Sequence, residues 1–362
     1  MKLIYITSKT YPSDTADKIY VRELASSFSK VLKEKFLLVV ANNHSLELNN
    51  INYLNLRLKY RRLKSVYYFL WLPFWVARNR SKNKLVFFSN DPYLLTILIF
   101  WRKLGFTYRV CSDWHQLFGD WRDKIVAESS DILVTTTQML KRGLVSLKVD
   151  SNKIHVVYGG IDLEGYPTVE KREARQTVSL PEDKKIIGYV GFYKTMGMEK
   201  GIRIMIDALK LLSSDYIMAF VGGTQEEIVE YSLYAQTQGV ANRCIFIERK
   251  SFNEVVVYEQ AMDMLVIPYP DEPHFRRWGF PMKVYEYLAS RRPIIYSRLD
   301  IIDEVLSDIA WSFEPGNSQD LSEVIKKIAN DTNVNDKVAK AYKIAENSTW
   351  GTKAVNIINL IG

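Results

Sequence analysis

The stretch Gly279-Phe280-Pro281-Met282-Lys283-Val284-Tyr285-Glu286-Tyr287-Leu288-Ala289 is the segment around which the rest of the chain is organised. A proline after a glycine-containing loop is a good first helical residue, so we expect a helix that begins at Pro281. Its free N–H groups and positive dipole end would favour an anion beside loop 268–280. Lys283 and Glu286 are three residues apart and share one face. This pattern suits a ligand with phosphates and hydroxyls, and a surface ion pair is the alternative.

The residues that follow continue an alternating pattern of helices and strands. Pro293-Ile294-Ile295-Tyr296-Ser297 is a short apolar run typical of a buried strand, and Asp303-Glu304-Val305-Leu306 begins another helical pattern. The whole segment, P-x-K-x-x-E-Y-L-A-x-x-x-P-I-I-x-S and then D-E-V-L, resembles the donor-site region of retaining GT-B glycosyltransferases of the large family-four type. The resemblance covers most of the chain. It implies an α/β fold of the GT-B kind, with two Rossmann-like parallel-sheet domains facing each other across a cleft.

Length and composition limit the possible classes of protein. A chain of 362 residues is long for one domain, so two domains are expected, and 47% hydrophobic with 25% charged residues is ordinary globular composition. Cys111 and Cys244 lie far apart inside apolar runs, which indicates free thiols of a reducing compartment rather than a disulfide. No CxxC or HExxH pattern occurs and the four histidines are scattered. We therefore expect no metal and no bound cofactor.

The net charge of +8 points to anionic partners of some kind. No module that interleaves basic residues with exposed aromatics is visible, so nucleic acid is not an expected partner. Phosphorylated sugars or an anionic membrane surface explain the surplus as well. The N-terminal Met-Lys-Leu-Ile-Tyr-Ile-Thr is a strand pattern rather than a signal peptide. The apolar stretch 66–77 is shorter than the ~20 residues of a spanning helix. We expect a cytoplasmic protein.

The first 41 residues have the pattern of a βαβ unit. Two apolar runs, 3–7 and 36–41, enclose a polar loop at 8–17 and a helical pattern up to residue 32. The family that the chain resembles usually carries a Gly-Gly pair in this loop, where backbone approaches the donor phosphates. Here Ala16-Asp17 takes that place. Contacts to the acceptor are expected instead from Tyr20 or Arg22.

Residues 57–84 have the most unusual composition of the chain. Cations flank the aromatic run Tyr-Tyr-Phe-Leu-Trp-Leu-Pro-Phe-Trp; they are Arg57, Lys59, Arg61, Arg62, Lys64, Arg78, Arg80, Lys82 and Lys84. An interfacial helix places rings at headgroup depth and basic side chains on phosphates, so we expect a peripheral contact with the inner face of a membrane. An ordinary helix packed on the sheet, with a solvated basic edge, is the alternative.

Further short apolar runs at 85–88, 108–111, 132–135 and 154–157 complete the first predicted sheet. Asp113 and His115 follow one of them, and residues just past the carboxyl end of a parallel strand face the ligand crevice. The resemblance implies that His115 contacts the donor sugar near the reacting centre, with Asp113 orienting the imidazole or meeting the acceptor.

The domain boundaries follow from a change of pattern after residue 157. Val157-Tyr158-Gly159-Gly160-Ile161-Asp162 is similar to the family's strand-to-linker signature, usually Asn-Gly-Val-Asp. We expect a first domain at 1–165, an irregular charged linker at 166–183 and a donor-binding domain at 184–348. The tail, 349–362, is similar to the family's final helix, which packs back on the first domain.

The second domain repeats the strand, glycine turn and helix order. Apolar run 185–190 precedes Gly191, and run 216–221 precedes Gly222, where backbone could approach a ligand. The resemblance makes Lys200 the donor pyrophosphate ligand. The family's Arg after the first glycine is Phe192 here, and Lys194 is expected to substitute. Relatives hold the nucleotide base with backbone groups at the position of Glu248-Arg249.

The predicted reaction is transfer of a sugar from a nucleoside diphosphate sugar to a hydroxyl of a glycan or lipid-linked acceptor, with retention and without a metal. Many relatives have a second glutamate separated by seven residues from the one that matches Glu286, and this chain has Trp278 at that place, which could stack on a sugar. The resemblance assigns Glu286 to the ribose hydroxyls, and Phe280, Pro281 and Lys283 to the donor side.

Three other functions remain open from the sequence. A nucleotide-sugar epimerase would use the same two-domain plan, and Phe192, Trp278 and the missing Gly-Gly would suit a non-catalytic glycosyltransferase-like subunit. A two-domain solute-binding protein is disfavoured by the basic charge and by the absence of an export signal pattern.

Overall fold

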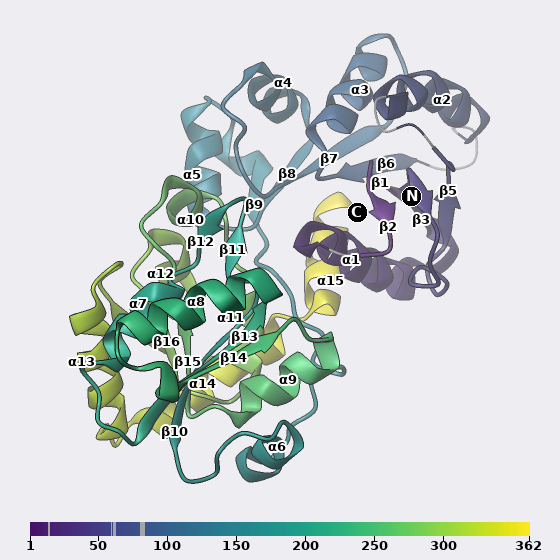
Figure 1. Ribbon diagram of the computed structural model, residues 1–362. Coiled ribbons are helices and arrows are strands. Elements are labelled where there is room, and N and C mark those ends of the chain that lie inside the picture. Colours follow the sequence, from purple (N-terminus) through teal and green to yellow (C-terminus); the bar gives the residue numbers. More distant parts are fainter. Residues whose placement is uncertain (14, 59, 61–62, 80–83) are drawn as a thin grey trace. The chain divides into compact units, whose positions relative to one another are not determined.

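A computed structural model describes residues 1–362 apart from 14, 59, 61–62 and 80–83. The chain forms two compact units (Figure 1). The first consists of Met1–Gly160 together with Trp350–Gly362, and the second of Ile161–Thr349. Each unit is built on one open parallel sheet with helices packed against it. The predicted α/β architecture with two Rossmann-like domains is confirmed.

The first unit has a seven-stranded sheet in the order β5-β3-β1-β6-β7-β8-β9. Its strands are β1 Lys2–Ile6, β3 Phe36–Val40, β5 Tyr53–Asn55, β6 Leu85–Ser89, β7 Arg109–Trp114, β8 Ile132–Thr135 and β9 Ile154–Val156, and a small separate pair joins β2 Thr10–Tyr11 to β4 Asn42–Asn43. Its helices are α1 Ala16–Leu32, α2 Lys64–Asn79, α3 Pro92–Lys103, α4 Trp121–Ser129, α5 Gln138–Ser146 and α15 Trp350–Ile361. All ladders of the large sheet are parallel.

The strands β1, β6 and β8 of this sheet are buried on both faces, which explains their continuous apolar sequences. A core cluster on one face joins β1, β6 and β7 to α2 and α3, through residues such as Phe87, Tyr68 and Leu98. On another side α15 packs against α1. The last helix of the chain therefore belongs to the first unit.

The second unit has a six-stranded parallel sheet in the order β14-β13-β10-β15-β16-β17. Its strands are β10 Lys185–Val190, β13 Tyr216–Gly223, β14 Cys244–Glu248, β15 Met264–Ile267, β16 Ile294–Ser297 and β17 Trp311–Phe313, with the antiparallel pair β11 Lys194–Thr195 and β12 Met198–Glu199. Its helices are α6 Lys171–Thr177, α7 Ile202–Leu209, α8 Gln225–Thr237, α9 Phe252–Ala261, α10 Pro273–Arg277, α11 Lys283–Ala289, α12 Asp300–Leu306, α13 Ser318–Ala329 and α14 Val334–Asn347.

Both sheets have the same switch in strand order. Counted within its own unit, the first strand lies between the second and the fourth: β1 between β3 and β6, and β10 between β13 and β15. In open α/β sheets of this kind, ligands bind outside the carboxyl ends of the strands where the order reverses. The loops after β1 and β6, and those after β10 and β15, are therefore the places to look for a site.

Two local predictions of secondary structure were wrong. The charged segment 166–183 is not irregular, because it contains α6, whose Arg175 is 4% exposed and donates to Asp263 at 2.6 Å and to the Ala261 carbonyl at 2.9 Å. The helix expected at Pro281 begins at Lys283: Val284 N–H donates to the Pro281 carbonyl at 3.1 Å, so a turn precedes the helix. α11 has seven residues, and Pro281 lies outside it.

Candidate functional site

Glycines crowd the switch point of the second sheet, at the ends of β10 and β13 and the start of α7. Gly191, Gly222 and Gly201 have φ of 146°, 116° and 87°. A Cβ on Gly222 would lie 2.6 Å from the Gly191 carbonyl oxygen, and one on Gly201 would lie 1.9 Å from the Pro268 oxygen that follows β15. No larger side chain fits these places without movement, so backbone is left accessible close to the carboxyl edge of the sheet.

Two lysines and a glutamate lie beside these glycines. The Lys200 ammonium is 5.7 Å from the centroid of the Tyr269 ring, and burial, followed by the charge of Lys283, lowers the pKa of Lys200 to about 8. Lys283 Nζ is 3.6 Å from Glu286 Oε2. A Cβ on Gly191 would meet Lys283 Cε at 2.5 Å. The structure thus brings the predicted Lys200, Lys283, Glu286 and Gly191 together, and two mutually repelling cations in one place are suited to an anion.

A buried carboxyl that the sequence did not indicate lies near this group. Glu259 on α9 is 0% exposed and accepts a hydrogen bond from the Tyr166 hydroxyl at 2.5 Å. Burial, and then the charge of Glu286, raises the pKa of Glu259 to about 8. Its Oε1 is buried without a hydrogen-bond partner among the described residues. A neutral Glu259 avoids a second negative charge next to Glu286.

The other predicted donor residues at strand ends have the following surroundings. Lys194 Nζ is paired with Glu230 of α8 at 2.6 Å. The Arg249 guanidinium lies 4.3 Å from the centroid of the Phe192 ring, so the residue after β14 reaches the residue that replaces the family's arginine. Glu248 is the last residue of β14 and pairs with Gly223 across the ladder, next to Gly222. Donor contacts by these residues stay predictions.

The loop before α11 carries Trp278 and Phe280. Trp278 directly follows the short helix α10, and both its N–H and that of Gly279 donate to the His274 carbonyl. The Phe280 ring packs 5.7 Å from that of Tyr285. Burial, and then the Lys200 charge, lowers the pKa of His274, which places this loop close to Lys200. Trp278, Phe280 and Pro281 thus belong to the neighbourhood of the lysine pair.

In the first unit the residues after β7 form a second polar cluster. Asp113 is 3% exposed; it accepts from the Tyr20 hydroxyl at 2.8 Å and lies 3.1 Å from His115 Nε2, both through Oδ2. Burial would raise the pKa of Asp113, but the His115 imidazole, the charge of Lys353 and the Tyr20 hydroxyl outweigh it and hold that pKa below its usual range. Asp113 is therefore a buried carboxylate that orients the partly exposed imidazole.

Lys353 completes this cluster and was not indicated by the sequence. It is 2% exposed on α15 and donates to the Val157 and Tyr158 carbonyls at 2.6 and 2.9 Å. Burial lowers the pKa of Lys353 to about 8, against the opposing attraction of Asp113. Only tertiary packing of the last helix brings this cation to Asp113, so no local pattern could have predicted it.

The two predicted acceptor residues differ in exposure. Tyr20 is buried, with its ring 4.3 Å from that of His115 and 5.3 Å from that of Trp350, so it supports the Asp113 cluster. Arg22 is half-buried and paired with Glu23 at 2.6 Å and Glu47 at 3.5 Å. Their contacts with an acceptor stay predictions.

The segment 57–84 contains α2 in its described part. Lys59, Arg61, Arg62, Arg80 and Lys82 lie outside the described residues. Tyr68, Leu72 and Val76 are buried in the core, while Leu63, Val66, Tyr67, Leu70 and Phe74 are exposed, and this exposed set is called the α2 stripe. None of the helices in the described ranges is long and apolar enough to cross a bilayer. Within the same ranges, no three His, Cys, Asp or Glu side chains gather as metal ligands would.

Two Rossmann-like units with a basic, glycine-lined switch point in the second are the architecture of GT-B glycosyltransferases. Family models agree with this assignment: residues 170–345 match "Glycosyl transferases group 1" and residues 21–164 match "Glycosyltransferase Family 4". The chain belongs to the group 1 glycosyltransferases of the GT-B fold.

Solved structures share the fold over the whole chain. HepE (Alr3699) of Anabaena, solved in complex with UDP, is 16% identical with a TM-score of 0.79 and covers 100% of this chain and 99% of its own. A glycosyltransferase from Rickettsia africae is 13% identical with a TM-score of 0.80, covering 99% and 97%.

Curated relatives match over shorter segments. A D-inositol 3-phosphate glycosyltransferase of Mycolicibacterium smegmatis is 24% identical over 187 residues, which are 51% of this chain and 41% of that protein. The O-antigen chain mannosyltransferase RfbU of Salmonella typhimurium is 24% identical over 183 residues, 50% of this chain and 45% of RfbU. The matched part of the chain spans less than half the length of these relatives.

Proposed function

We propose that this protein is a retaining, metal-independent glycosyltransferase that moves a sugar from a nucleoside diphosphate sugar to a hydroxyl of a glycan or lipid-linked acceptor. The expected setting is the synthesis of a cell-surface polysaccharide or glycolipid on the cytoplasmic side of a membrane. The observation that carries the proposal is the gathering of Lys200, Lys283 and Glu286 at the glycine-lined switch point of the second sheet.

The lysine pair suits the chemistry of a departing nucleoside diphosphate. As the bond between the anomeric carbon and the diphosphate oxygen breaks, negative charge grows on that oxygen, and preorganised cations stabilise it well in a site that excludes water. Lys200 and Lys283 are held near each other before any ligand binds, at the cost of mutual repulsion. A diphosphate removes that repulsion. Glu286, 3.6 Å from Lys283, is left to accept from ribose hydroxyls.

Attack by the acceptor hydroxyl on the same face of the sugar would give retention. The acceptor oxygen bonds to the anomeric carbon as the diphosphate leaves, and its proton passes to the departing phosphate oxygen. We assign His115 to the donor sugar, with Asp113 holding the imidazole through the 3.1 Å contact. Names of similar proteins accord with a nucleotide-sugar donor, since HepE was solved with UDP-glucose.

The α2 stripe supports peripheral membrane contact. Phe74 is 77% exposed and Leu70 57%, and their helix also carries Tyr67 and Val66 on its outer side. In contrast, Trp71 and Trp75 pack against the core, so only part of the aromatic run is available to lipid. Apolar side chains with flanking cations are the features that bind an interfacial helix to anionic lipid.

A panel of nucleoside diphosphates and nucleotide sugars in a thermal-shift assay tests the donor part of the proposal. A ligand that binds only the native state raises the melting temperature by mass action. We expect one nucleobase to give a shift that Lys200→Met abolishes. Lys210→Met is the matched control, because Lys210 is an exposed lysine that directly follows α7, the helix that begins just after Lys200. A shift that survives Lys200→Met would refute the assignment of Lys200.

Product analysis tests the reaction itself. With the donor identified, NMR of the anomeric proton in the transferred sugar distinguishes retention from inversion, and a chelator in the assay tests metal independence. Released sugar of changed configuration, without transfer, would indicate an epimerase instead.

One observation favours the non-catalytic alternative. Phe192 replaces the family's arginine and is 42% exposed, so this position supplies no cation to the leaving group. The Arg249 guanidinium lies 4.3 Å from the centroid of the Phe192 ring. Phe192→Arg distinguishes the two: if the wild-type protein binds a donor but neither transfers nor hydrolyses it, and the variant does, the protein is a non-catalytic subunit.

A further inference from the structure

A buried lysine of the last helix has no part in the donor chemistry described above. Lys353 on α15 is 2% exposed, and its ammonium lies 5.4 Å from the centroid of the Tyr20 ring. The Val157 and Tyr158 carbonyls accept its hydrogen bonds at 2.6 and 2.9 Å, but they carry no charge. An ammonium group removed from water is costly unless an opposite charge compensates it. The carboxylate that acts on Lys353 is Asp113, whose Oδ2 accepts from the Tyr20 hydroxyl at 2.8 Å.

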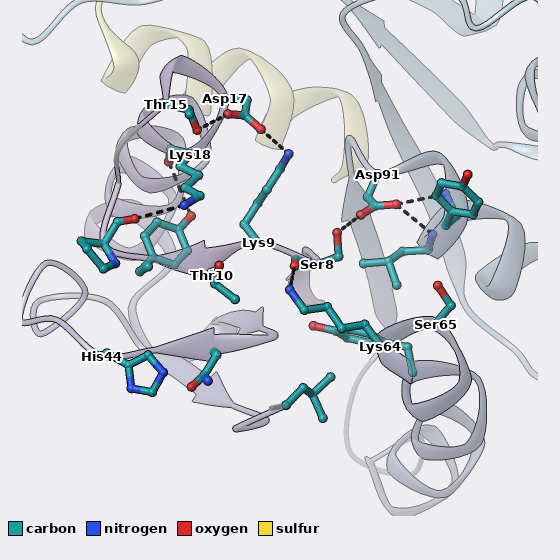
Figure 2. A pocket seen from close by; sticks show the side chains of 17 residues that line it. Ser8, Lys9, Thr10, Thr15, Asp17, Lys18, His44, Lys64, Ser65 and Asp91 are labelled. Carbon is teal, nitrogen blue, oxygen red and sulfur yellow. Dashed lines mark hydrogen bonds and ion pairs between the residues drawn. The ribbon is translucent and has the colours of Figure 1, made fainter. Parts of the chain in front are cut away.

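Lys353 and Asp113 are both buried, at 2% and 3% exposure, so neither is accessible to a ligand. Figure 2 shows a cavity of about 850 Å³ in the first unit, beside the loops after β1 and β6. Among the described residues, Ser8 and Asp91 line this cavity, and Lys353 and Asp113 do not. His115 is different, because its side chain is 33% exposed. An influence of Lys353 on a substrate must therefore pass through His115.

The contact between Asp113 and His115 fixes which nitrogen of the imidazole carries the proton. His115 Nε2 lies 3.1 Å from Asp113 Oδ2. An ionised carboxylate can only accept hydrogen bonds, so Nε2 must be the donor. In a neutral imidazole the other nitrogen, Nδ1, is then an acceptor. No hydrogen-bond partner is found for Nδ1 among the described residues, so it can accept from a ligand.

The charge of Asp113 decides whether the imidazole stays neutral. The cations with the largest effect on Asp113 are His115, when it is protonated, and Lys353. Burial lowers the pKa of Lys353 to about 8, so at pH 7 about nine-tenths of the molecules keep a charged ammonium. Because that ammonium already balances the carboxylate, the imidazole of His115 need not take up a proton to do so.

Three other titratable side chains face Asp113, and they stay uncharged near neutral pH. They are Tyr5 of β1, Tyr20 of α1 and Cys111 of β7. Burial, and then the negative charge of Asp113, raises the pKa of each of them. None of these three groups therefore alters the balance between Asp113 and the two cations.

We propose that Lys353 is a positioning residue for His115: through Asp113 it keeps the imidazole neutral and protonated on Nε2, so that Nδ1 accepts a hydrogen bond from a sugar hydroxyl. An imidazolium would instead donate from both nitrogens and favour an anionic group. The inference rests on the proposed function only for the nature of the ligand, because the protonation state of His115 exists without any substrate.

Histidine NMR on the ligand-free protein tests this protonation state. All four histidines are labelled with ¹⁵N, and His115→Asn identifies the signals of His115. Long-range ¹H–¹⁵N correlation distinguishes a bare ring nitrogen from a protonated one. At pH 7 we expect a protonated Nε2 and a bare Nδ1 in most wild-type molecules. A predominant imidazolium, or a proton on Nδ1, would overturn the proposal, and this measurement needs no variant at position 353.

Two substitutions of Lys353 separate its charge from its hydrogen bonds. Lys353→Gln keeps a side-chain donor for the Val157 and Tyr158 carbonyls without a charge, whereas Lys353→Arg keeps both donor and charge. We expect Lys353→Gln to extend the imidazolium form of His115 upward by about one pH unit or more, since an unbalanced carboxylate favours a cation beside it. Lys353→Arg is expected to leave the titration of His115 as in the wild type.

A double variant shows whether the effect passes through Asp113. Lys353→Gln is combined with Asp113→Asn and compared with Asp113→Asn alone, so that the cycle isolates the coupling between the two charges. The upward shift of the His115 titration is expected to vanish in this background. A shift that persists there, equal shifts in Lys353→Gln and Lys353→Arg, or no shift in Lys353→Gln would each contradict the proposal.

A transfer assay with the donor identified above connects the protonation state to turnover. Relative to the wild type at the same pH, Lys353→Gln is expected to lower kcat roughly tenfold at pH 7, the scale of one lost hydrogen bond. Most of that loss should be recovered at pH 8.5, where the additional proton is released, and Lys353→Arg should retain kcat at both pH values. Damage to the fold alone would lower the ratio equally at both.

The two ideas fail in different ways. The expected state of His115 in a wild-type protein that neither binds nor transfers a sugar would refute the proposed function and leave the role of Lys353 intact. Normal transfer by the wild type, together with a loss in Lys353→Gln that is the same at both pH values, would refute the role of Lys353 alone.

Discussion

Proton uptake on donor binding is the sharpest test of the lysine pair. Burial, and then Lys283, lowers the pKa of Lys200 to about 8, so near that pH about half of the molecules carry a neutral Lys200. A bound diphosphate favours the charged form and returns its pKa toward the ordinary value near 10.5. Binding therefore takes up about half a proton at pH 8 and nearly a whole proton at pH 9.

The same shift fixes the size of the effect on affinity. If the bound diphosphate returns the pKa of Lys200 from about 8 to 10.5, the dissociation constant of the diphosphate rises close to tenfold per pH unit between these two pH values. Over the whole interval the binding free energy of the diphosphate weakens by about 3 kcal/mol. It compares with the ~2.7–4 kcal/mol that one preorganised donor contributes to stabilising a transition state. Lys200→Met is thus expected to lower turnover by orders of magnitude as well as to abolish the pH dependence.

Isothermal titration calorimetry measures the uptake directly. The nucleoside diphosphate is titrated at pH 7, 8 and 9 in two buffers of different ionisation enthalpy, and the difference in heat gives the number of protons. Glu259 also has a pKa of about 8 and lies in the same unit, so Glu259→Gln is the necessary control. Uptake that persists in Lys200→Met, or that disappears only in Glu259→Gln, would refute the assignment to Lys200.

Three further outcomes are expected. Gly201→Ala should lower the unfolding free energy by roughly 3 kcal/mol in urea titrations, because the new Cβ meets the Pro268 oxygen at a left-handed φ; a change below 1 kcal/mol would contradict this. Glu259 is favoured neutral in the fold, so its contribution to stability is full below about pH 4.5 and is lost as pH rises toward 8; Glu259→Gln should remove about 5 kcal/mol of that pH dependence, and an unchanged slope would exclude Glu259 as its source. Phe74→Asp should weaken flotation with anionic vesicles at least tenfold, whereas Leu233→Asp, on an exposed helix position of the second unit, should not; equal flotation of both would argue against the α2 stripe.

The strands and the second-unit site were largely predictable from the sequence, for a physical reason. A strand buried on both faces needs a continuous apolar run, so the first and last residues of β8 and β10 could be predicted from the sequence. The site residues followed from the resemblance and from spacing within one short segment, as with Lys283 and Glu286. Strand ends were less certain: β13 continues through Gly222 and Gly223 because its ladder with β14 extends that far.

Residues that owe their role to packing between distant segments could not be predicted. No local pattern singles out Glu259, and its hydrogen-bond partner Tyr166 lies 93 positions earlier. Arg175 lies among charged residues typical of a linker, yet it is buried because Asp263 and the end of α9 surround it.

Because α15 is part of the first unit, the first unit can complete its folding only after the end of the chain has been synthesised. Residues 161–349 form one continuous unit, and it can fold as soon as it leaves the ribosome. The first unit, although synthesised earlier, must wait for residues 350–362 before Lys353 can reach the Val157 and Tyr158 carbonyls. Until then a nascent chain leaves exposed the side of α1 against which α15 packs in the finished protein.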